Sequence, residues 1–216
     1  MNAVLVVAVL IGSVVLHELG HAWVADREGD HTARNQGRIT LNPISHLDPV
    51  GSVLLPLLLF LSTQGTAVFG WARPVPVQPA NFRHPVWSDL KVSLAGIAAN
   101  LLLVPVGTLL VIGALKAEPL LGVRLADGVV FAGTLVIQIN LTLAVFNLLP
   151  IPPLDGSHVL YHLLPRRARA AYRSLDRFGL LALMVLLLLV PDALDVVFWP
   201  VARLSELTNA FIRLWI

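Results

Sequence analysis

The sequence predicts an all-α membrane protein with about four transmembrane helices, a re-entrant segment and a C-terminal amphipathic helix. The first observation behind this prediction is a shortage of charge. Only 13% of the 216 residues are charged, whereas soluble domains average about 25%. The second is that several apolar stretches are long enough to cross a hydrocarbon core of roughly 30 Å as helices. We expect one membrane-embedded domain over residues 1–216.

Four apolar stretches are the candidate transmembrane helices. They are Asn2–Ala25, Leu90–Leu115, Val129–Leu149 and Phe178–Val190. The last is short, and it reaches the length of a span only if it continues past Pro191 towards Trp199. Val50–Leu61 is also short and contains Pro56, so it either crosses the bilayer or dips in and returns. Val201–Ile216 mixes charged and apolar side chains, which indicates an amphipathic helix at the interface.

A stretch rich in proline and glycine, Asp26–Asp89, separates the first of these helices from Leu90–Leu115. Its prolines forbid a continuous helix. Within it, the residues Arg38–Leu41 and Val75–Val77 look extended. We therefore expect irregular and extended chain here, rather than a further helix.

The distribution of basic residues predicts the orientation. Most of them lie in the loops after the first helix and after Asp155: Arg27, Arg34, Arg38, Arg73, Arg83, Lys91, Arg166, Arg167, Arg169, Arg173 and Arg177. In the short connection at 116–127, Glu118 and Asp127 balance the basic residues. The positive-inside rule therefore places the two basic loops in the cytoplasm. Both reach that side only if Val50–Leu61 dips in and returns, which favours a re-entrant segment and an external N-terminus.

Composition also excludes some classes of function. The 15 Lys and Arg residues against 13 Asp and Glu give a net charge of +2, and the basic residues are spread over loops. A nucleic-acid partner is therefore not expected. The chain contains no cysteine, which excludes disulfides, a thiol nucleophile and thiolate metal ligands. Nothing in the sequence specifies an oligomeric state.

The strongest motif is His17-Glu18-Leu19-Gly20-His21, an H-E-x-x-H pattern. On a helix, positions i and i+4 share a face, so both imidazoles can reach one metal ion, and zinc suits such ligands. Glu18 can then take a proton from the attacking water. A chance match to a short pattern is the alternative. Three costly ionisable side chains on one turn of a membrane helix favour function instead.

Asp155 is the candidate third metal ligand. It ends the stretch Asn147-Leu148-Leu149-Pro150-Ile151-Pro152-Pro153-Leu154-Asp155, and the prolines break the helix before it. Irregular backbone at membrane depth is tolerated only when it is buried in protein or lines a wet cavity, as an active site would be. The predicted orientation brings Asp155 to the same side as His21. The alternative is that Asp155 caps the helix that follows it.

Four stretches of the chain resemble the site-2 protease family of intramembrane zinc metallopeptidases. They are HELGH at 17–21, GRITLNPISHLDPVGS at 37–52, GWARPVPVQPANFR at 70–83 and NLLPIPPLDG at 147–156. The resemblance implies that His17, His21 and Asp155 bind one zinc ion per chain and that Glu18 is the general acid/base. It also implies cleavage of a transmembrane helix of a substrate protein within or near the lipid bilayer. Together with the orientation predicted from the loop charges, this leads us to expect a multi-pass protein of the cell membrane with its active site towards the cytoplasm.

The resemblance also implies a β-hairpin-like region after the first helix, whose edge pairs with an unwound substrate strand. One departure lies in the third apolar stretch, where the usual Ala-Gly-Pro reads Ala95-Gly96-Ile97. It touches no proposed ligand. We expect the small branch of the family, without PDZ or CBS domains.

Several other polar residues have weaker assignments. Asn147, within the matched motif, is a candidate to hydrogen-bond the substrate backbone or the oxyanion formed on attack. A structural hydrogen bond is its alternative, and it is the favoured role for Asn140, Asn100 and His46. The histidines expected to face water or headgroups are His31, His84, His158 and His162. The expected interfacial anchors are Trp23, Trp71, Trp87 and Trp199.

Other functional classes fit less well. A serine-type intramembrane protease needs a G-x-S-x nucleophile motif, which the sequence lacks. An aspartyl type needs two intramembrane aspartates, and only Asp155 is well placed. A non-catalytic scaffold or a transporter with a structural metal site is the remaining alternative. It would have no use for Glu18 beside two ligands, and a transporter would show inverted repeats.

Overall fold

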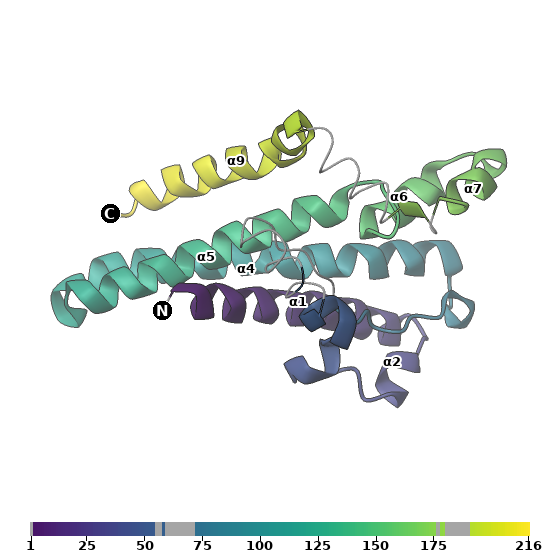
Figure 1. Cartoon of the computed structure of the whole chain (residues 1–216), viewed down its shortest axis with the longest axis horizontal. Helices are drawn as coiled ribbons and strands as arrows, with labels where there is room; N and C mark the ends of the chain where they lie inside the picture. Colours follow the sequence, from purple (N-terminus) through teal and green to yellow (C-terminus); the bar gives the residue numbers. More distant parts are fainter. Residues whose placement is uncertain (1, 55–57, 59–71, 176–177, 180–190) are drawn as a thin grey trace.

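The computed structural model describes residues 2–54, 58, 72–175, 178–179 and 191–216, and over these residues the chain forms helices and no strand (Figure 1). Three helices are long and apolar enough to cross a membrane: α1 (Asn2–Arg27), α4 (Pro85–Leu121) and α5 (Val123–Leu148). The shorter two have 26 residues each, which gives a length of about 39 Å. That exceeds the hydrocarbon core of roughly 30 Å.

These three helices confirm three of the four predicted spans. α4 begins earlier than predicted because Pro85 occupies a first-turn position, where a helix needs no N–H. It ends at Gly122, whose φ of 76° favours glycine and whose amide bonds the Glu118 carbonyl. The fourth predicted span, Phe178–Val190, lies almost wholly outside the described residues. So does most of Val50–Leu61, of which only the first part is seen in the π-helical η2 (Pro49–Leu54).

α4 and α5 form an antiparallel pair joined at Gly122 and packed through glycines. A Cβ atom on Gly107 would lie 2.8 Å from the carbonyl oxygen of Gly133, and one on Gly133 would lie 2.9 Å from that of Gly107. Such close approach of two backbones is the usual means of packing helices in lipid, where burial of apolar surface gives little gain. This pair is therefore the rigid frame of the bundle.

α1 packs against both helices of this pair. A Cβ atom on Gly20 would lie 2.9 Å from the carbonyl oxygen of Ala95, so α1 and α4 also touch through backbone. On the other side, Asn140 of α5 donates a hydrogen bond to the hydroxyl of Ser13, at 2.9 Å between buried atoms. This confirms the structural role predicted for Asn140. The two contacts fix the position of α1 in the bundle.

The C-terminal helix α9 runs from Pro191 to Arg213 and packs along α5 (Figure 1). The predicted start at Val201 was wrong, because the described helix already covers the residues before it and accommodates Pro200 within it. One face of α9 is buried through Val201 and Ile212, and its far end approaches α4, where Lys116 lies 5.8 Å from the ring centre of Trp215. The helix is amphipathic, as predicted.

Short elements cluster at one end of the bundle. They are α2 (Thr32–Asn35), the 3₁₀ turns η1 (Pro43–His46) and η3 (Pro79–Asn81), α6 (Asp155–Leu163) and α7 (Arg166–Arg173). Figure 1 shows α2, α6 and α7 at the end opposite the α4–α5 junction. Polar loops from two distant parts of the sequence therefore meet at this end.

The predicted hairpin is not found in the described part of the connection between α1 and α4. The residues Arg38–Leu41 and Val75–Val77 belong to no strand. Pro74 and Pro76 lack the N–H groups that a ladder needs. The two segments are instead joined by the side chain of Arg38, which donates hydrogen bonds to the carbonyls of Arg73 and Pro74.

Asp30 holds this connection together just beyond the end of α1. Its fully buried carboxylate accepts hydrogen bonds from the amide of Gln78 at 2.6 Å, from Asn81 at 2.8 Å and from the hydroxyl of Thr32 at 2.5 Å. Burial alone would raise the pKa of Asp30, but these hydrogen bonds outweigh it and lower the pKa below the ordinary 3.8. The carboxylate therefore ties the end of α1 to the chain that enters α4.

We predict that Asp30→Asn lowers the free energy of unfolding in detergent at pH 7 by about 1–3 kcal/mol, because an amide cannot accept all these hydrogen bonds. The carboxylate contributes its full stabilisation at pH values above 3.8, the ordinary pKa of an aspartate. This contribution is lost as the pH falls through the lower pKa that Asp30 has in the folded protein. The difference between variant and wild type should therefore shrink below that pH. Asp127→Asn, an exposed position on α5, is the control. A difference that persists unchanged in acid would contradict this account.

Candidate metal centre

α1 presents the two motif histidines on one buried face. His17 and His21 are one helical turn apart, and their Nε2 atoms lie 3.0 Å from each other. The rings meet edge to face, with centroids 4.6 Å apart. Because the i, i+4 spacing stacks them on one side of the helix, their inner nitrogens converge on a single point.

α4 makes room for these rings at Gly96. A Cβ atom there would lie 2.4 Å from Nε2 of His21 and 2.6 Å from Cε1 of His17, closer than any real contact. Only glycine fits at such a distance. Gly96 is therefore the residue of the Ala95-Gly96-Ile97 stretch that the two rings require. Ile97 is the residue that stands where the resembled family usually has proline.

The outer nitrogens of both rings are held by α4. Nδ1 of His21 donates a hydrogen bond to the carbonyl of Val92 at 2.7 Å. The amide of Asn100 lies 3.1 Å from Nδ1 of His17, and the Asn100 carbonyl oxygen is buried without another partner. Nδ2 of Asn100 is the atom that faces this nitrogen; with the amide turned over, its oxygen would accept the Nδ1 proton, and Nε2 of each ring would be free to bind a metal. The hydrogen bond predicted for Asn100 thus orients a candidate ligand.

Asp155 completes the cluster from the first turn of α6. Its Oδ2 atom lies 3.3 Å from Nε2 of both His17 and His21, and it is buried without a hydrogen-bond partner. Burial raises the pKa of Asp155, but the two imidazoles lower it by more, to about 2, so the carboxylate is an anion at neutral pH. Gly156 allows this position, since a Cβ atom there would lie 2.1 Å from the Leu148 carbonyl oxygen.

The donor set of the cluster fits zinc. Two imidazole nitrogens and one carboxylate oxygen, all within 4.8 Å of one another, converge with lone pairs facing inward. The Oδ2 atom of Asp155 is buried here without a hydrogen-bond partner, and with both rings neutral a cation would satisfy it together with the two ring nitrogens. Two histidines and one carboxylate are a usual ligand set for catalytic zinc, and they leave a fourth position open.

Asp89 of α4 fastens α6 in this position. Its carboxylate lies 2.7 Å from Nε2 of His162 and 3.2 Å from Nδ1 of His158. The expectation that both histidines face water or headgroups was wrong for His162, whose side chain is 10% exposed. The sequence could not show that Asp89, far from both along the chain, would meet them.

Glu18 is held by a segment other than α4 or α6. One of its carboxylate oxygens accepts a hydrogen bond from the backbone amide of Val75 at 2.8 Å. Val75 belongs to the segment that Arg38 holds through the Arg73 and Pro74 carbonyls. Sequence reasoning assigned neither Val75 nor Arg38 to the candidate site, although both lie in stretches that resemble the family.

The remaining predicted residues lie outside the cluster. Asn147 donates its amide to the carbonyl of Leu143, one turn back on α5, so no described contact joins it to the metal centre. His46 is buried, and its Nε2 donates to the Thr40 carbonyl at 3.0 Å, which confirms the predicted structural role. His31 pairs with Asp26 at 2.8 Å while remaining half-exposed.

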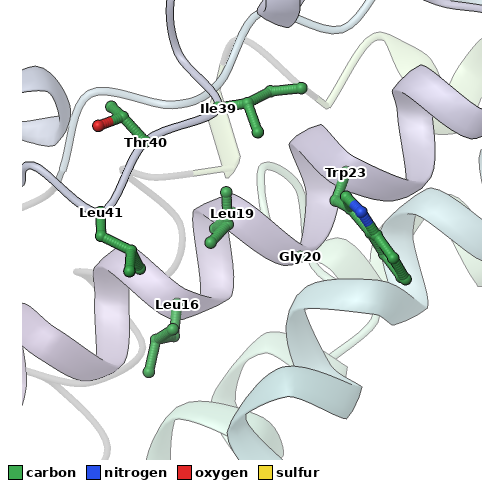
Figure 2. A pocket seen from close by; sticks show the side chains of 7 residues that line it. All are labelled: Leu16, Leu19, Gly20, Trp23, Ile39, Thr40 and Leu41. Atoms are coloured by element: carbon green, nitrogen blue, oxygen red, sulfur yellow. The ribbon is translucent and has the colours of Figure 1, made fainter.

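An apolar groove of about 430 Å³ lies between α1 and the segment that follows it (Figure 2). Its lining consists of Leu16, Leu19, Gly20, Trp23, Ile39, Thr40 and Leu41. Figure 2 shows the chain at Ile39–Leu41 running across α1, above the side chains of Leu16 and Leu19. The groove is thus lined by neighbours of the cluster residues along α1, and by the chain that leads away from Arg38.

This fold and this cluster define a class of protein: a helical membrane protein whose bundle brings two histidines and a carboxylate together where they could hold a metal ion, with a glutamate next to the first histidine. The family described as "Peptidase family M50" matches residues 5–190. The chain belongs to this family, the site-2 protease family, and is a zinc metallopeptidase embedded in a membrane.

Curated relatives carry corresponding names. The chain is 40% identical over 196 residues to "Putative zinc metalloprotease YwhC" of Bacillus subtilis (strain 168), covering 90% of this chain and 84% of that protein. It is 36% identical over 192 residues to "Putative zinc metalloprotease Rip2" of Mycolicibacterium smegmatis, covering 86% and 67%. The Rip2 protein of Mycobacterium tuberculosis (strain H37Rv) is 38% identical over 186 residues, with the same coverage. No solved structure matches the chain significantly.

We predict that Gly96→Ala weakens zinc binding by about 10–100-fold, because the added methyl group displaces both imidazoles. Zinc content after dialysis against a graded chelator measures this. Gly113→Ala is the matched control, since a Cβ atom at that position of the same helix meets nothing within 4 Å. Wild-type zinc retention by Gly96→Ala would show that the rings do not need this contact.

Proposed function

We propose that this chain is an intramembrane endopeptidase that hydrolyses peptide bonds in transmembrane segments of substrate proteins. The observation that carries the proposal is the position of Glu18. It stands next to His17 in a helix long and apolar enough to cross a membrane, beside a cluster that fits one zinc ion. A carboxylate in such a helix is costly unless it has a function.

In this proposal, His17, His21 and Asp155 hold the zinc ion, which when bound polarises a substrate carbonyl and makes water a better nucleophile. Glu18 accepts the proton of the attacking water and passes it to the nitrogen of the leaving amine. The Val75 amide keeps the Glu18 carboxylate turned in one direction. Asn140 and Asn100 act on helix position and on the His17 ring, outside the chemical step.

Asn147 is the proposed hydrogen-bond donor to the substrate backbone or to the oxyanion. Its amide group has two N–H bonds, and the Leu143 carbonyl takes only one of them. Asn147 lies at the end of α5, immediately before the chain that carries Asp155. A substrate at the zinc ion would bring a carbonyl to this part of the site.

The surroundings of the centre support a membrane-embedded substrate and a cytoplasmic active site. The apolar groove beside α1 suits an apolar segment, which must unwind locally before its peptide bonds can be attacked. The end of the bundle with α2, α6 and α7 carries the basic loops, whereas the α4–α5 junction lies at the other end (Figure 1). By the positive-inside rule we place the first end in the cytoplasm of a cell. We propose that residues 1–216 act as one membrane-embedded domain.

We predict that Glu18→Gln keeps its zinc and cleaves a single-span transmembrane substrate in nanodiscs about 10²–10⁴-fold more slowly, because the amide cannot accept the proton. Initial rates and zinc content, measured on the same samples, test this. Glu118→Gln, an exposed position on α4, is the control. Full cleavage by Glu18→Gln would exclude the mechanism. A wild-type protein that binds zinc but cleaves no transmembrane substrate would favour a scaffold.

We further predict that Asn147→Ala lowers kcat by about 10²–10³-fold without loss of zinc, because a donor to the oxyanion is removed. Asn209→Ala, exposed on α9, is the comparison. If Asn147→Ala lowers the unfolding temperature and leaves kcat unchanged, Asn147 has only the structural role of its bond to Leu143.

A further inference from the structure

The segment Arg73–Gln78 lies against α1 and the loops that follow it through backbone amides. The amide of Arg73 donates to the His46 carbonyl at 2.9 Å, that of Val75 to the Glu18 carboxylate at 2.8 Å, and that of Gln78 to Asp30 at 2.6 Å. The prolines on either side of Val75 have no N–H to offer. Between them, the Val75 amide is the donor that the segment presents to Glu18.

A single peptide group joins Glu18 to Arg38. The guanidinium of Arg38 donates to the Pro74 carbonyl at 3.3 Å and to the Arg73 carbonyl at 2.9 Å. The Pro74 carbonyl and the Val75 amide belong to the same planar unit, so a cation on its oxygen side fixes the direction of its N–H. Such a chain of hydrogen bonds also polarises the N–H and strengthens its bond to a carboxylate.

Arg38 is a buried cation whose described hydrogen bonds go to the backbone carbonyls of Arg73 and Pro74. The residue is 7% exposed, and its Nε atom is buried without a hydrogen-bond partner. It makes no ion pair with a carboxylate in the described part of the chain. Burial and the like charge of Arg73 lower the pKa of Arg38, and the negative charge of Glu18 opposes that lowering. A buried cation needs such compensation.

We propose that Arg38 is a positioning residue for the peptidase reaction, which fixes the Glu18 carboxylate through the Pro74–Val75 peptide group. The inference rests on the proposed role of Glu18 as general base. Arg38 touches neither the substrate nor the metal ligands in this arrangement. Its loss leaves zinc binding and substrate binding unchanged, and it slows the proton transfer because the carboxylate is free to turn away.

The first test compares variants that remove each end of this connection. Arg38→Ala removes the guanidinium, and Val75→Pro removes the N–H at a position where neighbouring prolines already favour an extended backbone. We expect each to lower kcat about tenfold or more, with KM and zinc content at wild-type levels. Val75→Ala keeps the N–H and measures the loss of side-chain packing alone. Its kcat should therefore fall less than that of Val75→Pro. Arg124→Ala, exposed in the first turn of α5, is the control for loss of an arginine.

The double variant Arg38→Ala/Val75→Pro distinguishes positioning from separate structural effects. If Arg38 acts through the Val75 amide, the double variant has the kcat of the slower single variant. Losses that multiply would overturn the proposal, as would wild-type kcat in Arg38→Ala or a loss of zinc from it. If Glu18→Gln is inactive and Arg38→Ala is fully active, this inference fails while the proposed function stands.

Hydrogen exchange of the Val75 amide tests the contact without any assay of cleavage. We expect both Arg38→Ala and Glu18→Gln to speed this exchange, because the N–H loses its fixed direction in one variant and its anionic acceptor in the other. Arg38→Lys should fall between wild type and Arg38→Ala, since an ammonium can reach one carbonyl but lacks the planar fork. Exchange at the wild-type rate in Arg38→Ala would overturn the proposal even if no substrate were found.

Discussion

The close approach of α1 to α4 is the constraint on which the rest of this structure depends. Gly20 meets the backbone of α4 at Ala95, and Gly96 receives both imidazole rings of α1. At this separation the Val92 carbonyl and the Asn100 amide reach the outer ring nitrogens of His21 and His17. A side chain at either glycine would push the helices apart, and the rings would lose both their partners and their common direction.

The same approach solves an electrostatic problem. Ionisable groups inside an apolar bundle are stable only when each has a partner, because the surrounding lipid offers none. Here the outer ring nitrogens bond α4, Glu18 bonds the Val75 amide, and Asp155 faces the two inner nitrogens. The Oδ2 atom of Asp155, buried without a hydrogen-bond partner, faces the place where zinc fits.

Packing at the basic end of the bundle brings the remaining parts of the centre together. Asp89 binds His158 and His162, which sets α6 against α4 and carries Asp155 to the histidines. Asp30 and Arg38 hold the chain between α1 and α4, which carries Val75 to Glu18. The frame of α4 and α5, packed through Gly107 and Gly133, supports both connections.

The sequence by itself determined three membrane helices and the pairing of His17 with His21, because apolar length and the i, i+4 spacing are local properties. It also identified Asp155, through a motif whose prolines end a helix. The tertiary structure alone decided which residues support them. Val75 lies 57 residues from Glu18, Asn100 lies 83 from His17, and Asp89 lies 73 from His162. Contacts over such separations follow from helix packing, which the order of residues along one helix does not encode.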